Sequence, residues 1–247
     1  MRRRSSAWPR SSRRRAPGST GDRPSSASAG AVSEDAGQAD LAAKYDRIAE
    51  KYAAAFFDEL TRKPFDRALL DRFAVAVAGR GRVCDLGCGP GHVGRYLAER
   101  GVEVFGLDLS PCMVELARRL NPAISFECGD MLALSLADAS LAGIVAFYSL
   151  IHLERDAVTR ALREMTRVLS PGGRMLIAFH GGVGQVHAEE WFGEKISMRA
   201  TLFEPNEMRE WLQATGLAVD EVAARDPYEF EYPTRRVYAS GTKLRSG

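Results

Sequence analysis

Three glycines at alternate positions could form a loop that binds a nucleoside. Gly87, Gly89 and Gly91 follow a short apolar run and precede a segment with helical periodicity. Glycine lacks a Cβ, so the backbone of such a loop can turn sharply and approach a ligand closely. Asp85 stands two residues before the first glycine, where its carboxylate would repel a pyrophosphate and attract a positive charge. Together these residues favour a nucleoside ligand that carries positive charge.

Asp108 is a second residue whose position indicates nucleoside binding. It follows a strand-like segment and stands 17 residues after Gly91. An acid at the end of the second strand can accept hydrogen bonds from both hydroxyls of a ribose. The alternative role, a helix N-cap, is already filled by Ser110, which precedes Pro111 at the first helical position. We therefore predict that Asp108 binds ribose.

The segments that must position these residues alternate between strand-like and helix-like patterns. Strands are predicted at 82–86, 102–107, 124–127, 143–148, 174–179, 218–223 and 236–240, helices at 41–60, 64–78, 91–100, 111–120, 156–169 and 205–215, and a turn at 170–173. Strands joined through helices make crossover connections. The predicted fold class is therefore α/β: a Rossmann-like, doubly wound, mainly parallel seven-stranded sheet with flanking helices. Such sheets bind ligands beyond the carboxyl ends of their strands.

Composition and charge limit the classes of partner. Of the 247 residues, 45% are hydrophobic and 27% are charged, as in soluble globular proteins, and no run approaches the roughly 18 apolar residues of a membrane span. Residues 1–30 carry eight arginines and one aspartate, which give +7, so the net charge of +2 leaves −5 for the rest. An acidic body is a poor surface for nucleic acid. We expect neither a nucleic-acid nor a membrane partner.

The N-terminal segment 1–38 is rich in arginine and serine and has no hydrophobic periodicity. Such a composition cannot bury a core, so we predict a disordered extension. A targeting segment and a start codon placed too far upstream are the alternatives. Residues 39–247 are predicted to form a single domain. The four cysteines make no C-x-x-C pair, so we expect no metal site and reduced thiols in the cytoplasm.

Five motifs resemble those of a known family. D-L-G-C-G-P-G at 85–91 and G-L-D-L-S at 106–110 resemble the first two motifs of the class I S-adenosylmethionine-dependent methyltransferases. C-G-D-M at 128–131, A-F-Y-S-L-I-H at 146–152 and L-S-P-G-G at 169–173 resemble later elements, in the family's order. The resemblance covers roughly residues 40–180 and is greatest to the small-molecule methyltransferases of bacterial specialised metabolism.

The resemblance implies that S-adenosylmethionine is the cofactor and indicates which residues bind it. The implied cofactor-binding residues are Asp85, Gly87, Cys88, Gly89, Gly91, Asp108, Leu109, Met113, Gly129, Asp130, Met131 and Phe147. Among them, Asp130 would accept a hydrogen bond from the exocyclic amine of adenine. Segment 39–78 would be a helical lid, in which Tyr45 and Tyr52 either contact the cofactor or anchor the helix in the core. Segments 181–203 and 226–233 would be loops on the substrate side.

The implied reaction is methyl transfer to an O, N or C atom of a small molecule. A base is needed only if that atom must lose a proton, and His152, which follows the fourth strand, is the candidate base. Tyr148 is a candidate for orienting the substrate. Either residue could instead be a structural part of the pocket wall. The fourth strand carries no aspartate, so no metal ion is expected in the reaction.

Two other function classes remain open. An NAD-dependent oxidoreductase would share the fold, although His92 stands where a dinucleotide-binding loop has its third glycine. The second alternative is a catalytically silent cofactor-binding protein that acts through its interactions. For each class we expect a monomer or a homodimer.

Overall fold

The computed structural model describes residues 34–245 of the 247-residue chain. Most of the predicted N-terminal extension therefore lies outside the described residues. Helix α1 (Glu34–Phe56) begins within the segment 1–38, so the prediction that the extension reaches residue 38 is wrong.

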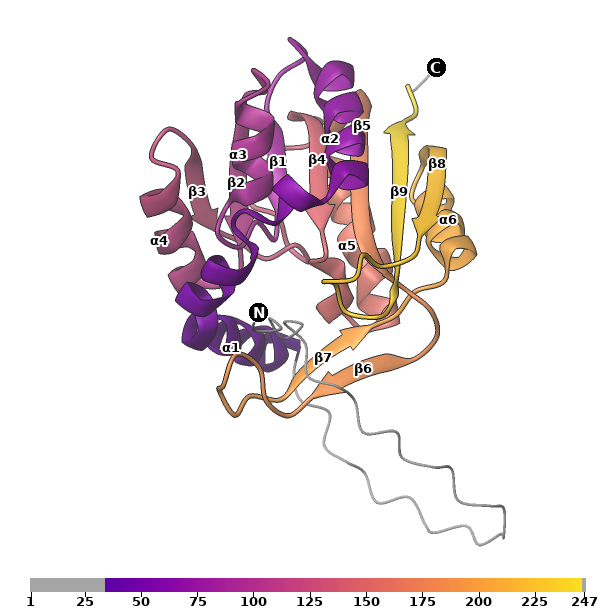
Figure 1. Cartoon of the computed structure of the whole chain (residues 1–247). Helices are drawn as coiled ribbons and strands as arrows, with labels where there is room; N and C mark the ends of the chain where they lie inside the picture. Colours follow the sequence, from indigo (N-terminus) through magenta and orange to yellow (C-terminus); the bar gives the residue numbers. More distant parts are fainter. Residues whose placement is uncertain (1–33, 246–247) are drawn as a thin grey trace, which may run out of the picture.

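Seven strands form one sheet in the order β3-β2-β1-β4-β5-β9-β8 (Figure 1). The strands are β1 (Val83–Leu86), β2 (Val104–Asp108), β3 (Ser125–Cys128), β4 (Leu141–Phe147), β5 (Leu169–Gly181), β8 (Leu217–Arg225) and β9 (Arg235–Lys243). The first five pair in parallel, and β9 pairs antiparallel with both β5 and β8. The order reverses at β1, with β2 on one side and β4 on the other. This arrangement confirms the predicted fold class.

Helices cover both faces of the sheet. On one face α2 (Pro64–Val77) packs against β5, and α3 (His92–Ala98) packs against β1 and β2 (Figure 1). On the other, α5 (Arg155–Val168) packs against β5 and α6 (Pro205–Ala214) packs against β8. Because apolar side chains alternate between the faces of a strand, buried residues of the central strands fill two cores.

Helix α4 (Pro111–Leu120) joins the sheet to α1. Ser110 caps it as predicted, with its Oγ accepting a hydrogen bond from the Met113 backbone N at 3.1 Å. Met113 and Leu116 pack against Ala49 and Ala53 of α1. Two short 3-10 helices, η1 (Glu59–Arg62) and η2 (Leu150–His152), complete the helical elements of the described part of the chain.

Two segments differ from their predicted structures. The turn predicted at 170–173 lies inside β5, where the pairing with β4 jumps from Leu141–Leu169 to Gly143–Arg174. The intervening residues form a bulge, because they oppose too few residues of β4. The segment 181–203, predicted to be irregular, contains an antiparallel hairpin of β6 (Gln185–Ala188) and β7 (Met198–Thr201).

The hairpin and α1 lie together beyond the carboxyl ends of the parallel strands (Figure 1). Glu194, in the hairpin turn, accepts hydrogen bonds from Arg47 Nη2 at 3.2 Å and Lys51 Nζ at 2.6 Å. The Trp191 ring lies 5.8 Å from that of Tyr52 in an edge-on contact. These contacts hold the hairpin against α1.

The glycine loop can be tested through the close packing beneath it. Gly91 has φ 79°, and a Cβ there would lie 2.6 Å from Phe126 Cζ. Gly101 has nearly the same φ, 77°, with nothing within 4 Å of such a Cβ. We expect Gly101→Ala to lower the free energy of unfolding by about 1–2 kcal/mol and Gly91→Ala to lower it by about 1–3 kcal/mol more. Urea unfolding measures both, and equal losses would contradict the packing argument.

Candidate active site

A cavity partly open to solvent lies at the carboxyl ends of β1, β2 and β4 beneath α1, with about 700 Å³ of empty space when the solvent at its mouth is included. Most of the predicted site residues line it: Tyr45, Tyr52, Gly87, Gly89, Asp108, Leu109, Gly129, Asp130, Met131, Phe147, Tyr148 and His152. These residues come from five separate segments of the chain. The sheet brings them together because the carboxyl ends of its parallel strands meet at one edge.

The Asp108 carboxylate organises one side of the cavity. Its Oδ2 accepts a hydrogen bond from the Gly89 backbone N at 2.8 Å, and its Oδ1 accepts one from the Ser110 backbone N at 2.9 Å. Burial raises the pKa of this carboxyl, while the backbone hydrogen bonds act in the opposite direction. The Leu109 backbone N–H also acts on this carboxylate, whose two oxygens together offer about four lone-pair sites. Asp108 can therefore fix the glycine loop and still accept hydrogen bonds from a ligand.

The lining is acidic and aromatic. Asp108 and Asp130 both line the cavity, and among the described residues no lysine or arginine does so. The rings of Tyr45, Tyr52 and Tyr148 add apolar surface with a negative π-face. Such a lining favours a ligand with positive charge and disfavours a pyrophosphate.

Four predicted residues do not line the cavity. Asp85 is 1% exposed, and its Oδ2 accepts a hydrogen bond from the Gly94 backbone N at 2.8 Å, near the start of α3. Cys88 and Gly91 pack against Phe126 beneath the loop, and Met113 is buried against α1. These residues shape the loop and its supports. Alternating glycines mark such a loop in a sequence but do not show which side chains face inward.

Sequence reasoning missed several lining residues. They are Gln38, Leu41, Ala42, Leu86, Ser110, Ser149 and Leu153. The first three share a face of α1 with Tyr45 at helical spacing. Leu41 and Ala42 lie on that face of the predicted helix 41–60, and extending the helix to residue 38 would have added Gln38. Within segment 39–78 only α1 reaches the cavity, whereas α2 packs on the sheet. Of the segment predicted to be a lid, α1 is thus the part that lines the cavity.

His152 is held by hydrogen bonds at both ring nitrogens. Its Nδ1 lies 3.0 Å from the Arg199 carbonyl oxygen, and its Nε2 lies 2.6 Å from the Tyr45 hydroxyl. A carbonyl only accepts, so Nδ1 carries the proton and Tyr45 donates to Nε2. Burial lowers the pKa of His152 to about 4. In this arrangement the ring fastens α1 to η2 and β7, and neither nitrogen is free to take a proton from an acceptor.

Tyr148 has a strained backbone. Its φ of 56° is left-handed, which costs a residue other than glycine about 1–3 kcal/mol. Its backbone N donates to the Ala178 carbonyl oxygen at 2.8 Å, which fixes the turn after β4. The ring consequently forms part of the cavity wall at the end of the sheet's central strands.

The chain is similar in sequence to known methyltransferases. Residues 83–173 match the family model described as "Methyltransferase domain". Trans-aconitate 2-methyltransferase from Methylobacterium nodulans is 32% identical over 182 residues, which are 67% of this chain and 67% of that protein. A demethylmenaquinone methyltransferase from Renibacterium salmoninarum is 33% identical over 142 residues, 56% of this chain and 58% of that protein. The chain spans about half the length of most of the curated relatives that it matches.

A solved structure shares the fold over most of the chain. The 1,6-didemethyltoxoflavin-N1-methyltransferase of Burkholderia thailandensis, with bound 1,6-didemethyltoxoflavin and S-adenosylhomocysteine, has a TM-score of 0.66. It is 22% identical, and the match covers 89% of this chain and 94% of that one. At this level of identity the likeness shows a common fold.

The hydrogen bonds of His152 predict that it stays neutral near physiological pH. We expect its ring NMR signals to be constant from about pH 8 down to about pH 5, because its pKa is lowered to about 4. In Tyr45→Phe, the His152 Nε2 loses the hydroxyl that donates to the neutral ring, so the pH midpoint of the His152 titration should rise. Tyr52→Phe, which removes a neighbouring hydroxyl, is the matched control. Titration of the wild-type His152 near pH 6.5 would contradict the assignment.

The buried carboxyl of Asp85 should make the stability of the chain depend on pH. Burial raises the pKa of its carboxyl to about 7, against about 3.9 in the unfolded chain. The folded chain therefore binds the proton more tightly, and stability falls as the pH rises from about 4 to about 7. Asp85→Asn keeps an oxygen for Gly94 and removes this dependence. When the pH is raised from about 5 to about 8, the free energy of unfolding of the wild type, measured in urea, should fall by on the order of 1–3 kcal/mol relative to that of the variant.

Asp138→Asn, at an exposed aspartate paired with Arg167, is the control for this comparison. If the free energies of unfolding of Asp85→Asn and the wild type changed in parallel with pH, the Asp85 carboxyl would not be the cause of the pH dependence.

Proposed function

The chain belongs to the class I S-adenosylmethionine-dependent methyltransferases, and on that premise we propose that it methylates a small-molecule acceptor. The cofactor is S-adenosylmethionine, which supplies an activated methyl group when bound. The observation that carries the proposal is the cavity lining, in which two carboxylates and three tyrosine rings stand without a lysine or arginine among the described residues. A sulfonium cofactor with a ribose and an adenine fits this acidic and aromatic lining better than a dinucleotide does.

Each part of the cofactor has residues suited to it. We infer that Asp108 accepts hydrogen bonds from the ribose hydroxyls with the lone pairs left free by Gly89 and Ser110. Asp130, whose Oδ1 accepts a hydrogen bond from the Leu132 backbone N at 2.8 Å, would accept one from the adenine amine beside Met131. The rings of Tyr45 and Tyr52 would cover the sulfonium and exclude water.

The acceptor is proposed from the names of similar proteins and from the cavity. Trans-aconitate, demethylmenaquinone and 1,6-didemethyltoxoflavin are the small molecules that those names contain. The Phe147 and Tyr148 rings would form the wall beside the transferred methyl, with α1 above them. The resemblance of the motifs to enzymes of bacterial specialised metabolism supports a role there. The main task of these residues is alignment of the two reactants.

Calorimetric titration of the full chain tests the cofactor site. We expect binding of S-adenosylmethionine and S-adenosylhomocysteine, and none of NADH. Asp108→Ala should weaken binding about 100-fold or more, because hydrogen bonds to a charged group are lost. Asp156→Ala, at an exposed aspartate in the first turn of α5, should bind as the wild type does. Failure to bind either sulfur ligand would overturn the proposal.

A screen of small molecules with radiolabelled S-adenosylmethionine then separates an enzyme from a silent cofactor-binding protein. Label transferred to a hydroxyl, amine or carbon acceptor supports the enzyme. Cofactor binding without transfer to any acceptor favours the silent alternative.

A further inference from the structure

A chain of three hydrogen-bonded side chains leads from the cavity into the protein. Tyr148 lines the cavity, and its hydroxyl lies 3.3 Å from the Tyr238 hydroxyl. The Tyr238 hydroxyl lies 3.0 Å from Asp66 Oδ2. Tyr148 follows β4, and Tyr238 lies within β9. Asp66 lies in the first turn of α2. Their contact is therefore a product of the tertiary structure alone.

The donors in this chain all point away from the cavity. Arg225 Nε donates to the Tyr238 oxygen at 3.1 Å. An ionised Asp66 can only accept, so Tyr238 donates to Asp66. Tyr238 then has no proton left for Tyr148, and Tyr148 must donate to Tyr238. Because Tyr148 donates its proton to Tyr238, its oxygen can still accept a hydrogen bond.

Asp66 is suited to receive a proton at the buried end. It is fully buried, and its Oδ1 has no hydrogen-bond partner among the described residues. Burial raises the pKa of its carboxyl, and the positive charges of Lys63 and Arg225 act in the opposite direction. Arg225 Nη2 donates to Oδ2 at 2.9 Å. Burial disfavours the charged form of a carboxyl group whose oxygen lacks a hydrogen-bond partner, so binding a proton stabilises it.

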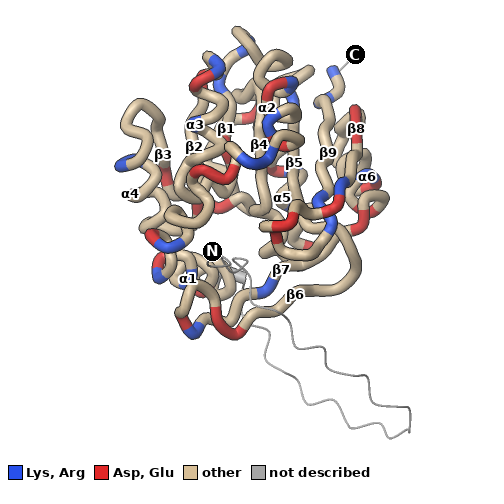
Figure 2. The backbone as a smooth tube through the Cα atoms, in the orientation of Figure 1, with Lys and Arg blue, Asp and Glu red and all other residues tan. Residues whose placement is uncertain are grey.

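Positive side chains surround the Tyr148 ring. Lys63 Nζ lies 5.3 Å and Arg236 Cζ 5.8 Å from its centroid. Both cations are also paired with Glu231, at 3.2 Å and 3.5 Å. Burial is the largest cause of a raised pKa at the Tyr148 phenol, and the positive charge of Arg236 acts in the opposite direction. Tyr148 therefore has to pass its own proton on as it receives another. Acidic and basic residues lie close together near the lower ends of β5 and β9 (Figure 2).

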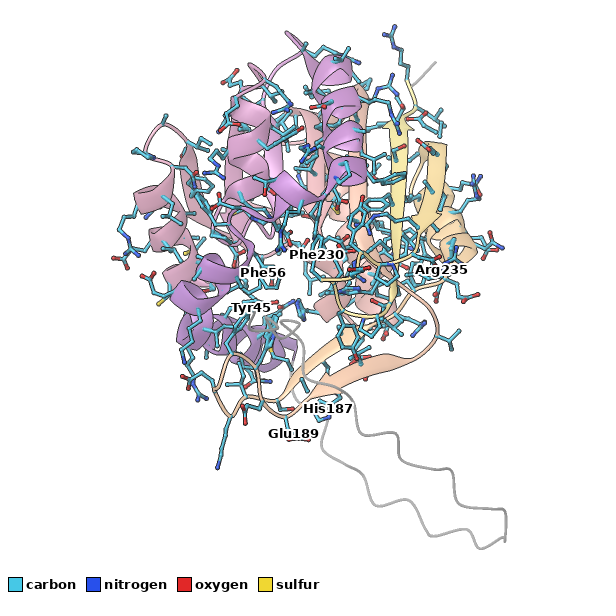
Figure 3. All side chains as sticks on the ribbon, in the orientation of Figure 1. Tyr45, Phe56, His187, Glu189, Phe230 and Arg235 are labelled. Atoms are coloured by element: carbon cyan, nitrogen blue, oxygen red, sulfur yellow. The ribbon has the colours of Figure 1, made fainter. Side chains whose placement is uncertain are left out.

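The histidines near the cavity do not compete for this role. His180, whose ring lies 5.2 Å from that of Tyr148, accepts at Nδ1 from Arg236 Nη1 and lies close to Thr234 Oγ1. His152 is engaged at both nitrogens. His187 is on the outer hairpin, away from Tyr45 (Figure 3). Tyr148 is the wall residue whose hydroxyl connects the cavity to a buried carboxylate.

We propose that Tyr148, Tyr238 and Asp66 form a proton relay that deprotonates an acceptor O–H or N–H during methyl transfer. This rests on the proposed function. The acceptor proton moves to the Tyr148 oxygen, the Tyr148 proton moves to Tyr238, and the Tyr238 proton moves to Asp66 Oδ2. The acceptor atom keeps its electron pair for the new bond to carbon, and every hydrogen bond in the chain reverses. Tyr148 is the catalytic residue, while Tyr238 and Asp66 act through it as positioning residues.

Infrared titration of the full chain saturated with S-adenosylhomocysteine tests the relay without an acceptor. We expect the carbonyl band of a protonated, buried carboxyl to titrate and to be absent in Asp66→Asn. A band that persists in that variant but disappears in Asp85→Asn belongs to the other buried aspartate. In Tyr148→Phe, Tyr238 loses a donor and binds Asp66 less strongly. The Asp66 midpoint should then rise by about 0.3 pH units or more.

The matched control is Tyr96→Phe, which removes a tyrosine that donates to Asp71 Oδ1 at 2.9 Å outside the relay. It should leave the Asp66 band unchanged. An Asp66 band that ignores Tyr148→Phe, or the lack of any such band, would overturn the relay. These outcomes concern only the Asp66 band and do not change cofactor binding in calorimetry. Failure of the relay can therefore be told apart from failure of the proposed function.

A phenol whose ionisation is visible tests the cavity end of the relay. With S-adenosylhomocysteine bound, 4-nitrophenol should be ionised by the wild type at a pH below its pKa in solution. Tyr148→Phe and Asp66→Asn should bind it in the protonated form. A wild-type chain that binds 4-nitrophenol without ionising it would refute the role of Tyr148 as the first proton acceptor.

Discussion

The contact on which the glycine-loop side of the cavity depends is that of Asp108 with two backbone N–H groups. One belongs to Gly89 in the glycine loop and the other to Ser110 before α4. A carboxylate that accepts charge-assisted hydrogen bonds from both fixes the loop relative to the next crossover. Asp46 of α1 adds to this junction, since its Oδ1 accepts from Ser110 Oγ at 2.5 Å and the Cys112 backbone N at 3.0 Å. The glycine loop, α4 and α1 therefore share one anchoring point.

The two sides of the cavity are built by different physical means. The side formed by the glycine loop and Asp108 uses backbone turns and carboxylates that lie close to one another in the sequence. The other side depends on buried charges from distant segments, among them Asp66 with Arg225 and Lys63 with Glu231. Buried ion pairs contribute little net stability, because desolvation offsets their attraction, but they fix the positions of the groups that they join. Here they hold the loop that follows β8 against the start of α2.

The cover over the cavity is apolar inside and ionic outside. Tyr45 and Tyr52 face the hairpin residue Trp191, and Tyr45 also binds His152. The outer surface is joined by the pairs of Glu194 with Arg47 and Lys51. Because exposed ion pairs are weak, the aromatic contacts and the Tyr45–His152 hydrogen bond account for most of this attachment. Among the described residues no helix is long and apolar enough to cross a membrane.

The sequence by itself determined the fold class, the family and the cofactor, because these depend on local patterns. Alternating strand and helix periodicity fixed the crossovers, and the glycine loop with Asp108 lies within two consecutive βα units. The tertiary structure decided which side chains face the cavity. It turned Asp85 under the loop, engaged His152 with Tyr45 across 107 positions, and joined Tyr238 to Asp66 across 172. No periodicity encodes such pairs, since they arise only when the sheet order brings distant strand ends to one edge.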